Sequence, residues 1–374
     1  MELRKVELME VWVRLREPFE TSFGRTIERP AILVRVEERG GEEGWGEVVA
    51  DSGPWYSYET NETAWHVIRD FILPQLNNVS SPAEFAREFA RIRGHNMAKA
   101  GVEMALWDLA SRLESKPLWR FIGGVRRYVV SGVSVGIQPS IDALVSVVRR
   151  YLEEGYRRVK IKIRPGYDVQ PVEALRREFG YDLPLQVDAN AAYTLSDIDL
   201  LRTLDNFSLL MIEQPLGWHD LVDHAELARH LRTPICLDES VTDLEDARKA
   251  YQLGAAAILN VKPARVGGLG ETLRIHDFWY GVAKRPMWIG GMLETGVGRG
   301  HLVAAATLPG VRFPNDISAS SRYYEEDIVE PPWELNKDGT ITAPERPGIG
   351  VEVLVDKVKK MVKRSLEHTY AEGR

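Results

Sequence analysis

Hydrophobic and polar positions follow two patterns in the first third of the chain. Between residues 3 and 36 apolar side chains alternate with polar ones, a period of two that predicts two or three antiparallel strands. Apolar residues then recur at helical spacing over residues 63–71 and again over residues 97–113. Strands followed by helices predict an α+β module.

Beyond residue 125 the pattern changes to short apolar runs that alternate with longer helical stretches. The runs cover residues 129–135, 159–163, 183–187, 209–212, 235–237, 256–261 and 287–289, with a weaker one near Val311. Strands that alternate with helices predict a parallel sheet with right-handed crossovers. Eight such strands favour closure into a barrel, which takes about 250 residues.

The last part of the chain lies beyond the eighth predicted strand. Residues 340–374 contain a predicted hairpin and a predicted helix over residues 351–366. We therefore expect this segment to return to the first module.

Composition and charge narrow the class of protein. The chain is 44% hydrophobic and 28% charged, which is typical of a folded protein with a substantial core. Its 48 basic and 55 acidic residues give a net charge of −7 without a long block of either sign, so we expect neither a nucleic-acid nor a membrane partner. The single cysteine, Cys236, excludes an intrachain disulfide and a cysteine-based zinc cluster. The chain starts without a signal-like apolar stretch, and we expect a cytoplasmic protein.

Five polar residues stand at the ends of consecutive predicted strands. They are Lys162, Asp188, Glu213, Asp238 and Lys262, at spacings of 26, 25, 25 and 24 residues. A βα unit of a barrel takes about 30 residues, so these spacings predict one residue per unit at the same end of the barrel. Barrel enzymes carry their catalytic groups at the carboxyl ends of the strands.

The residue types at these five positions indicate metal chemistry. One acidic residue after a strand usually caps the next helix, but capping does not explain five polar residues in register. Three carboxylates without a nearby histidine or cysteine suit a hard cation with oxygen ligands, with Mg²⁺ as the first candidate and Mn²⁺ as the second. Magnesium prefers about six ligands, so positions remain for water and for a substrate carboxylate.

The two lysines flank the acids in strand order and would face each other across the metal. This arrangement suits proton transfer at the carbon next to a bound carboxylate, with the metal stabilising the enediolate. A lysine acts as a base only in its neutral form, which a nearby cation favours. Lys160 could have this effect on Lys162, and Arg265 on Lys262.

The same residues resemble a known family. A resemblance to the enolase superfamily, in its muconate lactonizing enzyme subgroup, is carried by residues 160–162, 188–190, 212–215, 238–240 and 262–263. Residues 290–296 and 316–320 are similar to the o-succinylbenzoate synthase and N-acylamino acid racemase family. The resemblance covers nearly the whole chain.

The resemblance implies an α/β fold with a modified TIM barrel, (β/α)7β, under an α+β capping domain. The capping domain would contain residues 1–125 and a returning segment at residues 321–374, and the barrel would contain residues 126–320. Asp188, Glu213 and Asp238 would be the magnesium ligands, and Lys162 and Lys262 the acid/base residues. Residues near the substrate would be Ser134, Lys160, Asn190, Met292, Asp316 to Ser318 and, in the loop that covers the mouth, Phe19 and Phe23.

The implied function is α-proton abstraction from a small-molecule carboxylate. The products would be o-succinylbenzoate, on the way to menaquinone, a racemised N-acylamino acid, or both. Alternatives are a dipeptide epimerase or a muconate cycloisomerase of the same subgroup. A non-catalytic scaffold would not need paired lysines, and a Schiff-base aldolase would leave three aligned acids unexplained. The sequence is compatible with a monomer and with a homo-oligomer.

A glycine-rich segment at residues 266–270 has a second interpretation as a phosphate cradle. It matches neither a P-loop nor a dinucleotide-binding motif, so a tight turn between a strand and a helix is the favoured interpretation.

Overall fold

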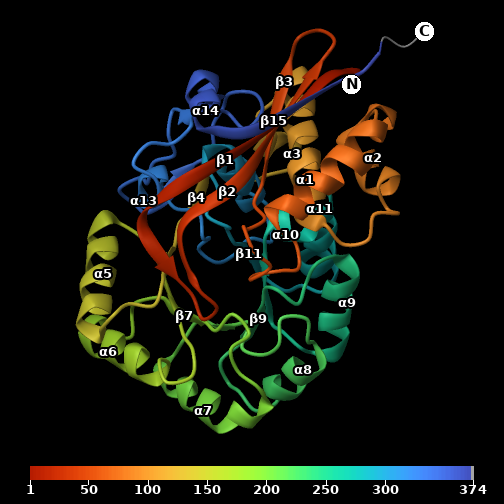
Figure 1. Cartoon of the computed structure of the whole chain (residues 1–374). Coiled ribbons are helices and arrows are strands. Elements are labelled where there is room, and N and C mark those ends of the chain that lie inside the picture. The colour runs from red at the N-terminus through yellow and green to blue at the C-terminus, as the bar shows by residue number, and fades with distance from the viewer. Residues whose placement is uncertain (372–374) are drawn as a thin grey trace.

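The computed structural model describes residues 1–371 and contains an antiparallel sheet beside a barrel of parallel strands (Figure 1). The antiparallel sheet has the order β15-β1-β2-β3. Its strands are β1 (Leu3–Glu20), β2 (Arg25–Glu38), β3 (Glu43–Val48) and β15 (Val362–Thr369). Strands β1 and β2 are the antiparallel strands that the alternating pattern over residues 3–36 predicts, and β3, which pairs with β2, lies beyond that pattern.

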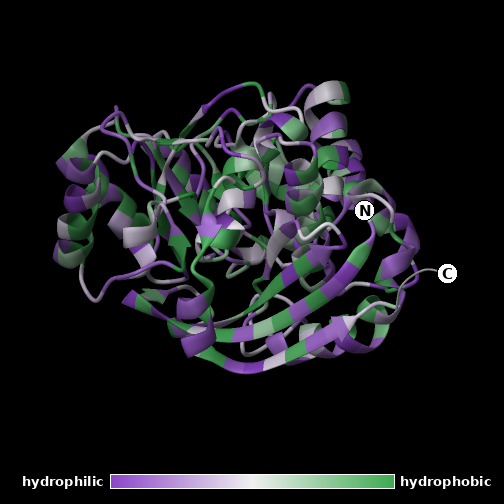
Figure 2. Cartoon of the chain, turned by 90° about the horizontal axis from the view of Figure 1, so that it is seen from above, coloured by the Kyte–Doolittle hydropathy of each residue, from purple (hydrophilic) through white to green (hydrophobic). Residues whose placement is uncertain are grey.

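Both faces of this sheet are covered, because alternate side chains of β1 enter different hydrophobic clusters. Val6 and Leu8 pack with the helices of the N-terminal module, whereas Met9 and Val11 belong to the cluster that also contains the barrel interior. In Figure 2, purple and green segments alternate along the long strands of the sheet.

The predicted helix over residues 351–366 is confirmed only over Val355–Met361 and is wrong at both ends. Helix α14 covers only Val355–Met361, and the chain continues as β15, which pairs antiparallel with β1 from Lys5↔Thr369 to Val11↔Val362. Half-buried and exposed residues alternate along β15, and Leu366 lies against the hydrophobic cluster of the N-terminal module. Pairing with the open edge of β1 decides the conformation, because it supplies the hydrogen bonds that an unpaired edge lacks.

The helices of the N-terminal module pack on the antiparallel sheet. They are α1 (Asn61–Val67) with the π-helical turn Ile68–Ile72 and the 3-10 turn Leu73–Asn78, α2 (Pro82–Glu88), α3 (Asn96–Leu113) and α4 (Leu118–Phe121). The predicted helix over residues 97–113 corresponds to α3, which approaches β3 closely. A Cβ at Gly46 would lie 2.0 Å from the Gly101 carbonyl oxygen, so glycine is required there.

Seven parallel strands form the barrel sheet, in the order β11-β10-β9-β8-β7-β6-β5. They are β5 (Val133–Val135), β6 (Val159–Lys162), β7 (Leu185–Asp188), β8 (Ile212–Glu213), β9 (Ile235–Leu237), β10 (Ile258–Val261) and β11 (Met287–Ile289). The weak run near Val311 contributes one parallel bridge to Met287, and Asn315 bridges to Ser131 beside β5. These two bridges connect the last strand back to the first, and the architecture is the predicted modified TIM barrel with a capping domain.

The first predicted barrel run, over residues 129–135, is divided in the structure. Its first part is β4 (Tyr128–Val130), which pairs antiparallel with β13 (Thr340–Thr342), and only its second part, β5, joins the barrel. A second short pair joins β12 (Val329–Glu330) to β14 (Glu352–Val353). The hairpin predicted within residues 340–374 is therefore wrong, because β13, β14 and β15 each pair with a strand from an earlier part of the chain.

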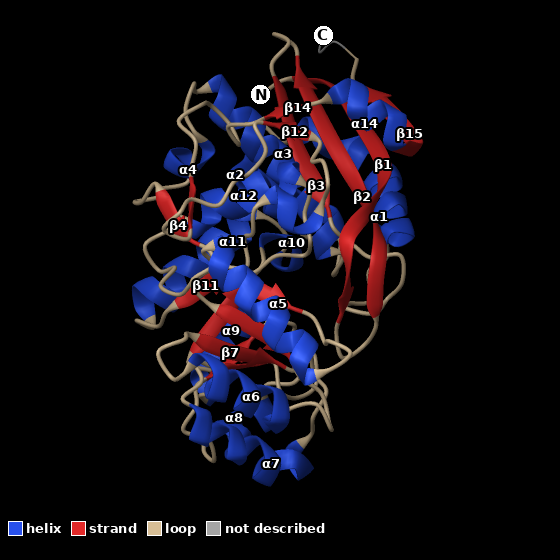
Figure 3. Cartoon of the chain, turned by 90° about the vertical axis from the view of Figure 1, so that its left-hand side faces the viewer, coloured by secondary structure: helices blue, strands red, loops and turns tan. Residues whose placement is uncertain are grey.

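Helices surround the barrel strands, with α6, α7 and α8 on the side of the barrel remote from β1 and β2 (Figure 3). The bounds are α5 (Ile141–Glu154), α6 (Val169–Phe179), α7 (Ile198–Thr203), α8 (Val222–Ala228), α9 (Leu244–Leu253), α10 (Pro263–Val266), α11 (Leu269–His276), α12 (Gly296–Ala306) and α13 (Ser320–Tyr323). Three 3-10 or π turns complete the list, Leu195–Asp197, Leu204–Phe207 and Asp277–Val282. Local sequence sets their ends, as in α9, where the Asp243 side chain accepts a hydrogen bond from the Asp246 N–H and Gly254 adopts the left-handed conformation.

The domain boundaries placed at residues 125 and 320, between the capping domain and the barrel, stay predictions. Within residues 1–371, every helix is too short or too polar to cross a membrane.

Candidate active site

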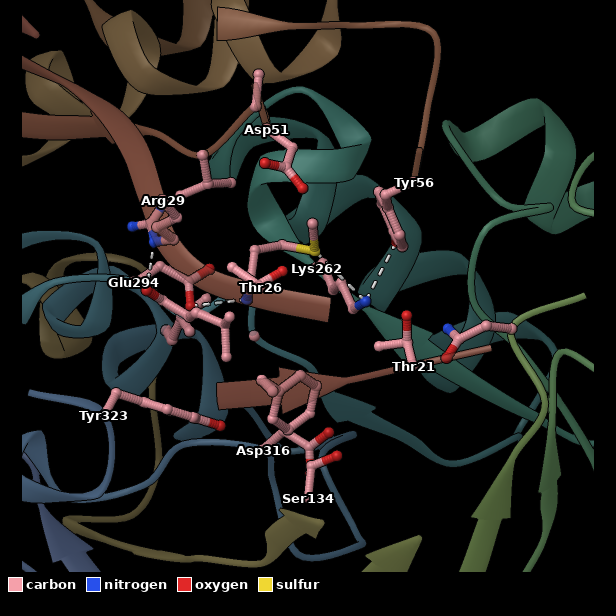
Figure 4. A pocket seen from close by; sticks show the side chains of 18 of the residues that line it. Thr21, Thr26, Arg29, Asp51, Tyr56, Ser134, Lys262, Glu294, Asp316 and Tyr323 are labelled. Atoms are coloured by element: carbon pink, nitrogen blue, oxygen red, sulfur yellow. Dashed lines mark hydrogen bonds between the residues drawn. The ribbon is translucent and has the colours of Figure 1, made fainter. Parts of the chain in front are cut away.

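A cavity lies between the mouth of the barrel and the capping domain (Figure 4). It leaves about 940 Å³ free of protein atoms, counted together with the solvent at its opening. The capping domain contributes the turn between β1 and β2 and the loop after β3, whereas the barrel contributes residues at the ends of its strands. Apolar side chains together with a few convergent charged groups make a lining that suits a small molecule.

The five strand-end residues lie together beneath this cavity. Lys162 is in register with Asp188, and Asp188 with Glu213, so neighbouring strands present these side chains at the same height. Lys162 donates to Asp188 over 2.6 Å, and Lys262 donates to Asp238 over 2.8 Å. The lysines lie on opposite sides of the carboxylates, because three strands separate β6 from β10.

Lys160, two residues before Lys162, joins the carboxylates to one another. Its ammonium lies 3.0 Å from Glu213, 3.2 Å from Asp188 and 2.5 Å from Asp316. Burial alone would lower the pKa of Lys160, but these three carboxylates outweigh it and hold that pKa above its ordinary value.

The buried acids differ in pKa according to their neighbours. Burial raises the pKa of Glu213 to about 7, with a further contribution from Asp188. Burial, Asp238 and Asp188 together raise the pKa of Glu239 to about 8. For Asp238 itself burial acts upward, but Lys262 and Arg265 hold the pKa below its ordinary value. Glu213 and Glu239 are therefore harder to ionise than a free carboxyl group, whereas Asp238 is easier to ionise.

The donor chemistry of this cluster fits a divalent cation. Asp188, Glu213 and Asp238 are almost fully buried, and Glu239 Oε2 has no hydrogen-bond partner within residues 1–371. In the same part of the chain no three acidic, histidine or cysteine side chains converge as a preformed metal site, and each of the three carboxylates contacts a lysine instead. Oxygen ligands and mutual repulsion between acids are both features that a hard cation satisfies.

Tyr56 is a site residue that sequence reasoning missed. Its hydroxyl donates to Asp238 over 2.8 Å and accepts from Lys262 over 3.2 Å, and the Lys262 ammonium lies 4.5 Å from the centre of its ring. Tyr56 belongs to the loop after β3, far from the barrel motifs in sequence, so no spacing signal connects it to them.

Arg265 and Lys262 contact the same carboxylate, that of Asp238. Arg265 forms an ion pair with Asp238 and donates to the Val241 carbonyl over 2.8 Å. Burial would lower the pKa of Lys262, but Asp238 outweighs burial and raises it above the ordinary value. Asp238 thus raises the pKa of Lys262, which is the opposite of the lowering that the sequence suggested for Arg265.

Most residues predicted near the substrate line the cavity. These are Phe19, Phe23, Ser134, Lys160, Asn190, Met292 and Asp316. Asn190 accepts from Lys162 over 2.8 Å, and Asp316 is held between Lys160 and the fully buried Arg158, 2.6 Å away. Ser318 differs, because it is buried behind this lining and its carbonyl oxygen accepts from Arg299.

A buried ion pair ties the capping domain to the barrel next to the cavity. Glu47, on β3, accepts from Arg29, from the Thr295 hydroxyl over 2.6 Å and from the Gly298 N–H over 2.9 Å. It therefore caps the amino-terminal end of α12. Arg29 also donates to the Leu293 carbonyl over 2.7 Å, close to Met292.

Glu47→Gln is expected to destabilise the protein by about 3–5 kcal/mol, because it leaves the buried Arg29 without its counter-ion. Denaturant unfolding of both proteins at one pH would measure the difference. Glu178→Gln is a suitable control, because it breaks the exposed pair with Arg149 and should cost about 1 kcal/mol or less. Equal losses for the two variants would contradict the role assigned to Glu47.

Two family models match the chain. Residues 3–123 match the model of the mandelate racemase / muconate lactonizing enzyme N-terminal domain, and residues 143–357 match the enolase C-terminal domain-like model. Together they cover β1 to β3 of the capping sheet and β6 to β11 of the barrel.

Relatives of known activity match almost the whole chain. It is 49% identical to an o-succinylbenzoate synthase of Geobacillus stearothermophilus, over 93% of this chain and 92% of that protein. It is 47% identical to an N-succinylamino acid racemase of Thermus thermophilus, over 96% of this chain and 97% of that one. A crystal structure of an enolase superfamily member from Listeria innocua superposes with a TM-score of 0.94 at 40% identity and covers 99% of both chains.

Proposed function

Since the chain belongs to the enolase superfamily, in its mandelate racemase / muconate lactonizing enzyme subgroup, we propose that it removes the α-proton of a small carboxylate substrate as an o-succinylbenzoate synthase, an N-succinylamino acid racemase, or both. The observation that supports this chemistry best is the pair of lysines, Lys162 and Lys262, on opposite sides of three buried carboxylates. Either reaction begins with the same proton transfer.

Lys162 and Lys262 act as the acid and the base. In racemisation one lysine takes the α-proton from one face of the substrate, and the other lysine delivers a proton to the opposite face. In dehydration a lysine takes the α-proton and delivers a proton to the neighbouring hydroxyl group, which leaves as water, while the electron pair of the broken C–H bond forms the carbon–carbon double bond. Both lysines are buried beside the cavity, so a substrate bound there would lie between them and bulk water.

Asp188, Glu213 and Asp238 would hold Mg²⁺, with Mn²⁺ as the alternative. The bound cation would supply positive charge next to the substrate carboxylate, which stabilises the negative charge left when the proton departs. Asp238 contacts Lys262 directly, so sharing this carboxylate with a cation would weaken the interaction that keeps the lysine protonated.

The remaining lining residues would bind and orient the substrate. Phe19, near the end of β1, and Phe23, in the turn between β1 and β2, present apolar surface, and the Lys162 ammonium lies 6.0 Å from the centre of the Phe19 ring. Ser134, Asn190, Met292 and Asp316 face the cavity from the barrel side. We assign Ser318 a supporting place behind the lining.

Incubation with Mg²⁺ in D₂O separates the two activities. We expect an N-succinylamino acid to gain deuterium at its α-carbon, and the cyclohexadiene precursor to give the absorbance change of the aromatic product. A dipeptide and a muconate serve as controls for the alternative members of the subgroup. Neither exchange nor turnover with the first two substrates would contradict the proposed function.

A further inference from the structure

A second buried carboxylate of the capping domain reaches into the barrel away from the cavity. Glu103, in the middle of α3, accepts from the Leu269 N–H over 2.8 Å and from the Gly270 N–H over 2.8 Å. These N–H groups open helix α11 of the barrel, so Glu103 caps that helix from another domain. The Trp107 indole N–H, one turn further along α3, donates to the same carboxylate over 2.6 Å.

The segment that Glu103 contacts is built for close approach. Gly267 and Gly268 have φ values of 102° and 125°, which side chains rarely tolerate. A Cβ at Gly268 would lie 2.2 Å from Glu103 Oε2, and a Cβ at Gly270 would lie 2.9 Å from Oε1. The glycine-rich segment at residues 266–270 thus receives an internal carboxylate of the capping domain, which explains its composition without a phosphate ligand.

Two further contacts hold the same turn. Asn96, at the start of α3, donates to the Arg265 carbonyl over 3.1 Å and to the Thr242 carbonyl over 2.9 Å. Ala264 is buried in the hydrophobic cluster of the capping domain rather than in that of the barrel. The capping domain therefore contacts residues 264–270 at three places, which are Ala264, the Arg265 carbonyl and the N–H groups of residues 269–270.

This turn begins at Lys262. Lys262 is the residue immediately before α10, and α10 leads directly through the two glycines to α11. The backbone that carries Lys262 is thus fixed on one side by β10 and on the other by α3. A displacement of about 1 Å at a catalytic group is enough to cost a factor of about 100 in rate.

We propose that Glu103 is a positioning residue for Lys262, which holds the turn after β10 so that the Lys262 ammonium meets one face of the substrate. This inference rests on the proposed acid/base roles of the two lysines. It assigns the capping domain a part in catalysis on one substrate face, because Lys162 stands on β6 with three strands between it and β10.

The cost of burying Glu103 supports a specific role. Burial raises the pKa of this carboxyl to about 7, against the opposing effect of the Gly270, Trp107 and Leu269 N–H donors. A buried carboxylate is retained at such a cost where its hydrogen bonds are needed.

Glu103→Gln tests the proposal. The amide keeps the shape of the carboxylate but offers a single acceptor oxygen, whereas in the unmodified protein three N–H groups share the two carboxylate oxygens. The measurement is α-hydrogen exchange in D₂O with Mg²⁺, made separately on the L and the D enantiomer of an N-succinylamino acid. Lys262→Ala first identifies the enantiomer whose exchange depends on Lys262. We expect Glu103→Gln to slow exchange of that enantiomer by about tenfold or more, through kcat rather than KM, and to change the other enantiomer less than twofold.

Asp108→Asn is the matched control. Asp108 is also a buried carboxylate of α3 and accepts from the Ile349 N–H over 2.7 Å, but it does not contact the turn after Lys262. We expect it to affect both enantiomers equally. If Glu103→Gln does not fold, Asn96→Ala takes its place, because it removes two contacts to the same region without removing a buried charge.

Two outcomes would overturn the positioning role. Equal slowing of both enantiomers by Glu103→Gln, or by Asn96→Ala in its place, would make the contact merely structural, and unchanged exchange would make it irrelevant to Lys262. Absence of exchange with either enantiomer in the unmodified protein would instead contradict the proposed function, so the two failures are distinguishable.

Discussion

Lys162→Ala is expected to lower the rate of racemisation by at least about 10³-fold, which is within the usual contribution of a general acid or base. Lys162 ends strand β6, points at Asp188 and Asn190, and is buried beside the cavity. Alanine has no group that can accept or deliver a proton there. Dehydration should fall by a similar factor if Lys162 is the base for that reaction.

Face-specific exchange makes this prediction sharper. Without Lys162 only Lys262 can remove an α-proton, so one enantiomer of an N-succinylamino acid should still exchange its α-hydrogen in D₂O while racemisation stops. The readout is exchange and optical rotation followed on the same sample.

The matched control removes a lysine that takes no part in the site. Lys249→Ala, on the exposed side of α9, should keep the full rate, because Lys249 contacts only the Asp246 carboxylate, 3.5 Å away, among the ion pairs of residues 1–371. We expect Lys162→Ala to fold, because Lys160 still contacts Asp188 over 3.2 Å. Thermal unfolding checks this. Racemisation by folded Lys162→Ala at the normal rate would remove Lys162 from the mechanism.

Glu213→Gln is expected to abolish activity through the loss of Mg²⁺. Glu213 lies at the centre of the cluster, fully buried at the end of β8, and contacts Lys160 over 3.0 Å and Asn260 over 2.6 Å. Changes to residues that only support metal ligands cost about 10–100-fold in affinity, so loss of a ligand should weaken Mg²⁺ binding by at least about 100-fold.

Binding and stability give readouts that do not depend on turnover. Calorimetric titration with Mg²⁺ should show one site in the unmodified protein and weak or no binding in Glu213→Gln. At a concentration of about 100 times the dissociation constant, Mg²⁺ should stabilise the unmodified protein by about 2.7 kcal/mol, visible as a higher Tm.

Glu226→Gln controls for loss of a carboxylate on the exposed surface of α8, where Glu226 contacts Arg229 and His230. It should bind Mg²⁺ like the unmodified protein. Undiminished Mg²⁺ affinity in Glu213→Gln would show that the metal lies elsewhere.

The repeat of strand and helix was predictable from local pattern, because each βα unit carries its own signal. A constant spacing of about 25 residues predicts that Lys162, Asp188 and Glu213 share one end of the barrel, and the strand register bears this out. The same argument needs no knowledge of the helices between them.

Local pattern failed where the conformation depends on a distant partner. Residues 362–366 were predicted as the end of a helix, but pairing with the open edge of β1 makes them part of a strand. Residues 129–135 read as one strand, but β13 pairs with the first part and β6 with the second.

The sequence by itself determined the barrel period, the five charged residues at its mouth and, through the resemblance, several of the residues that line the cavity. Only the tertiary structure decided that Tyr56 contacts Lys262, that Glu47 and Glu103 cap helices of another domain, and that Ser318 lies behind the lining. The physical reason is the distance along the chain between the residues that make contact. Strand-end positions follow from a repeat within the chain, whereas the contacts of Tyr56, Glu47 and Glu103 join residues more than 160 positions apart, which no periodicity relates.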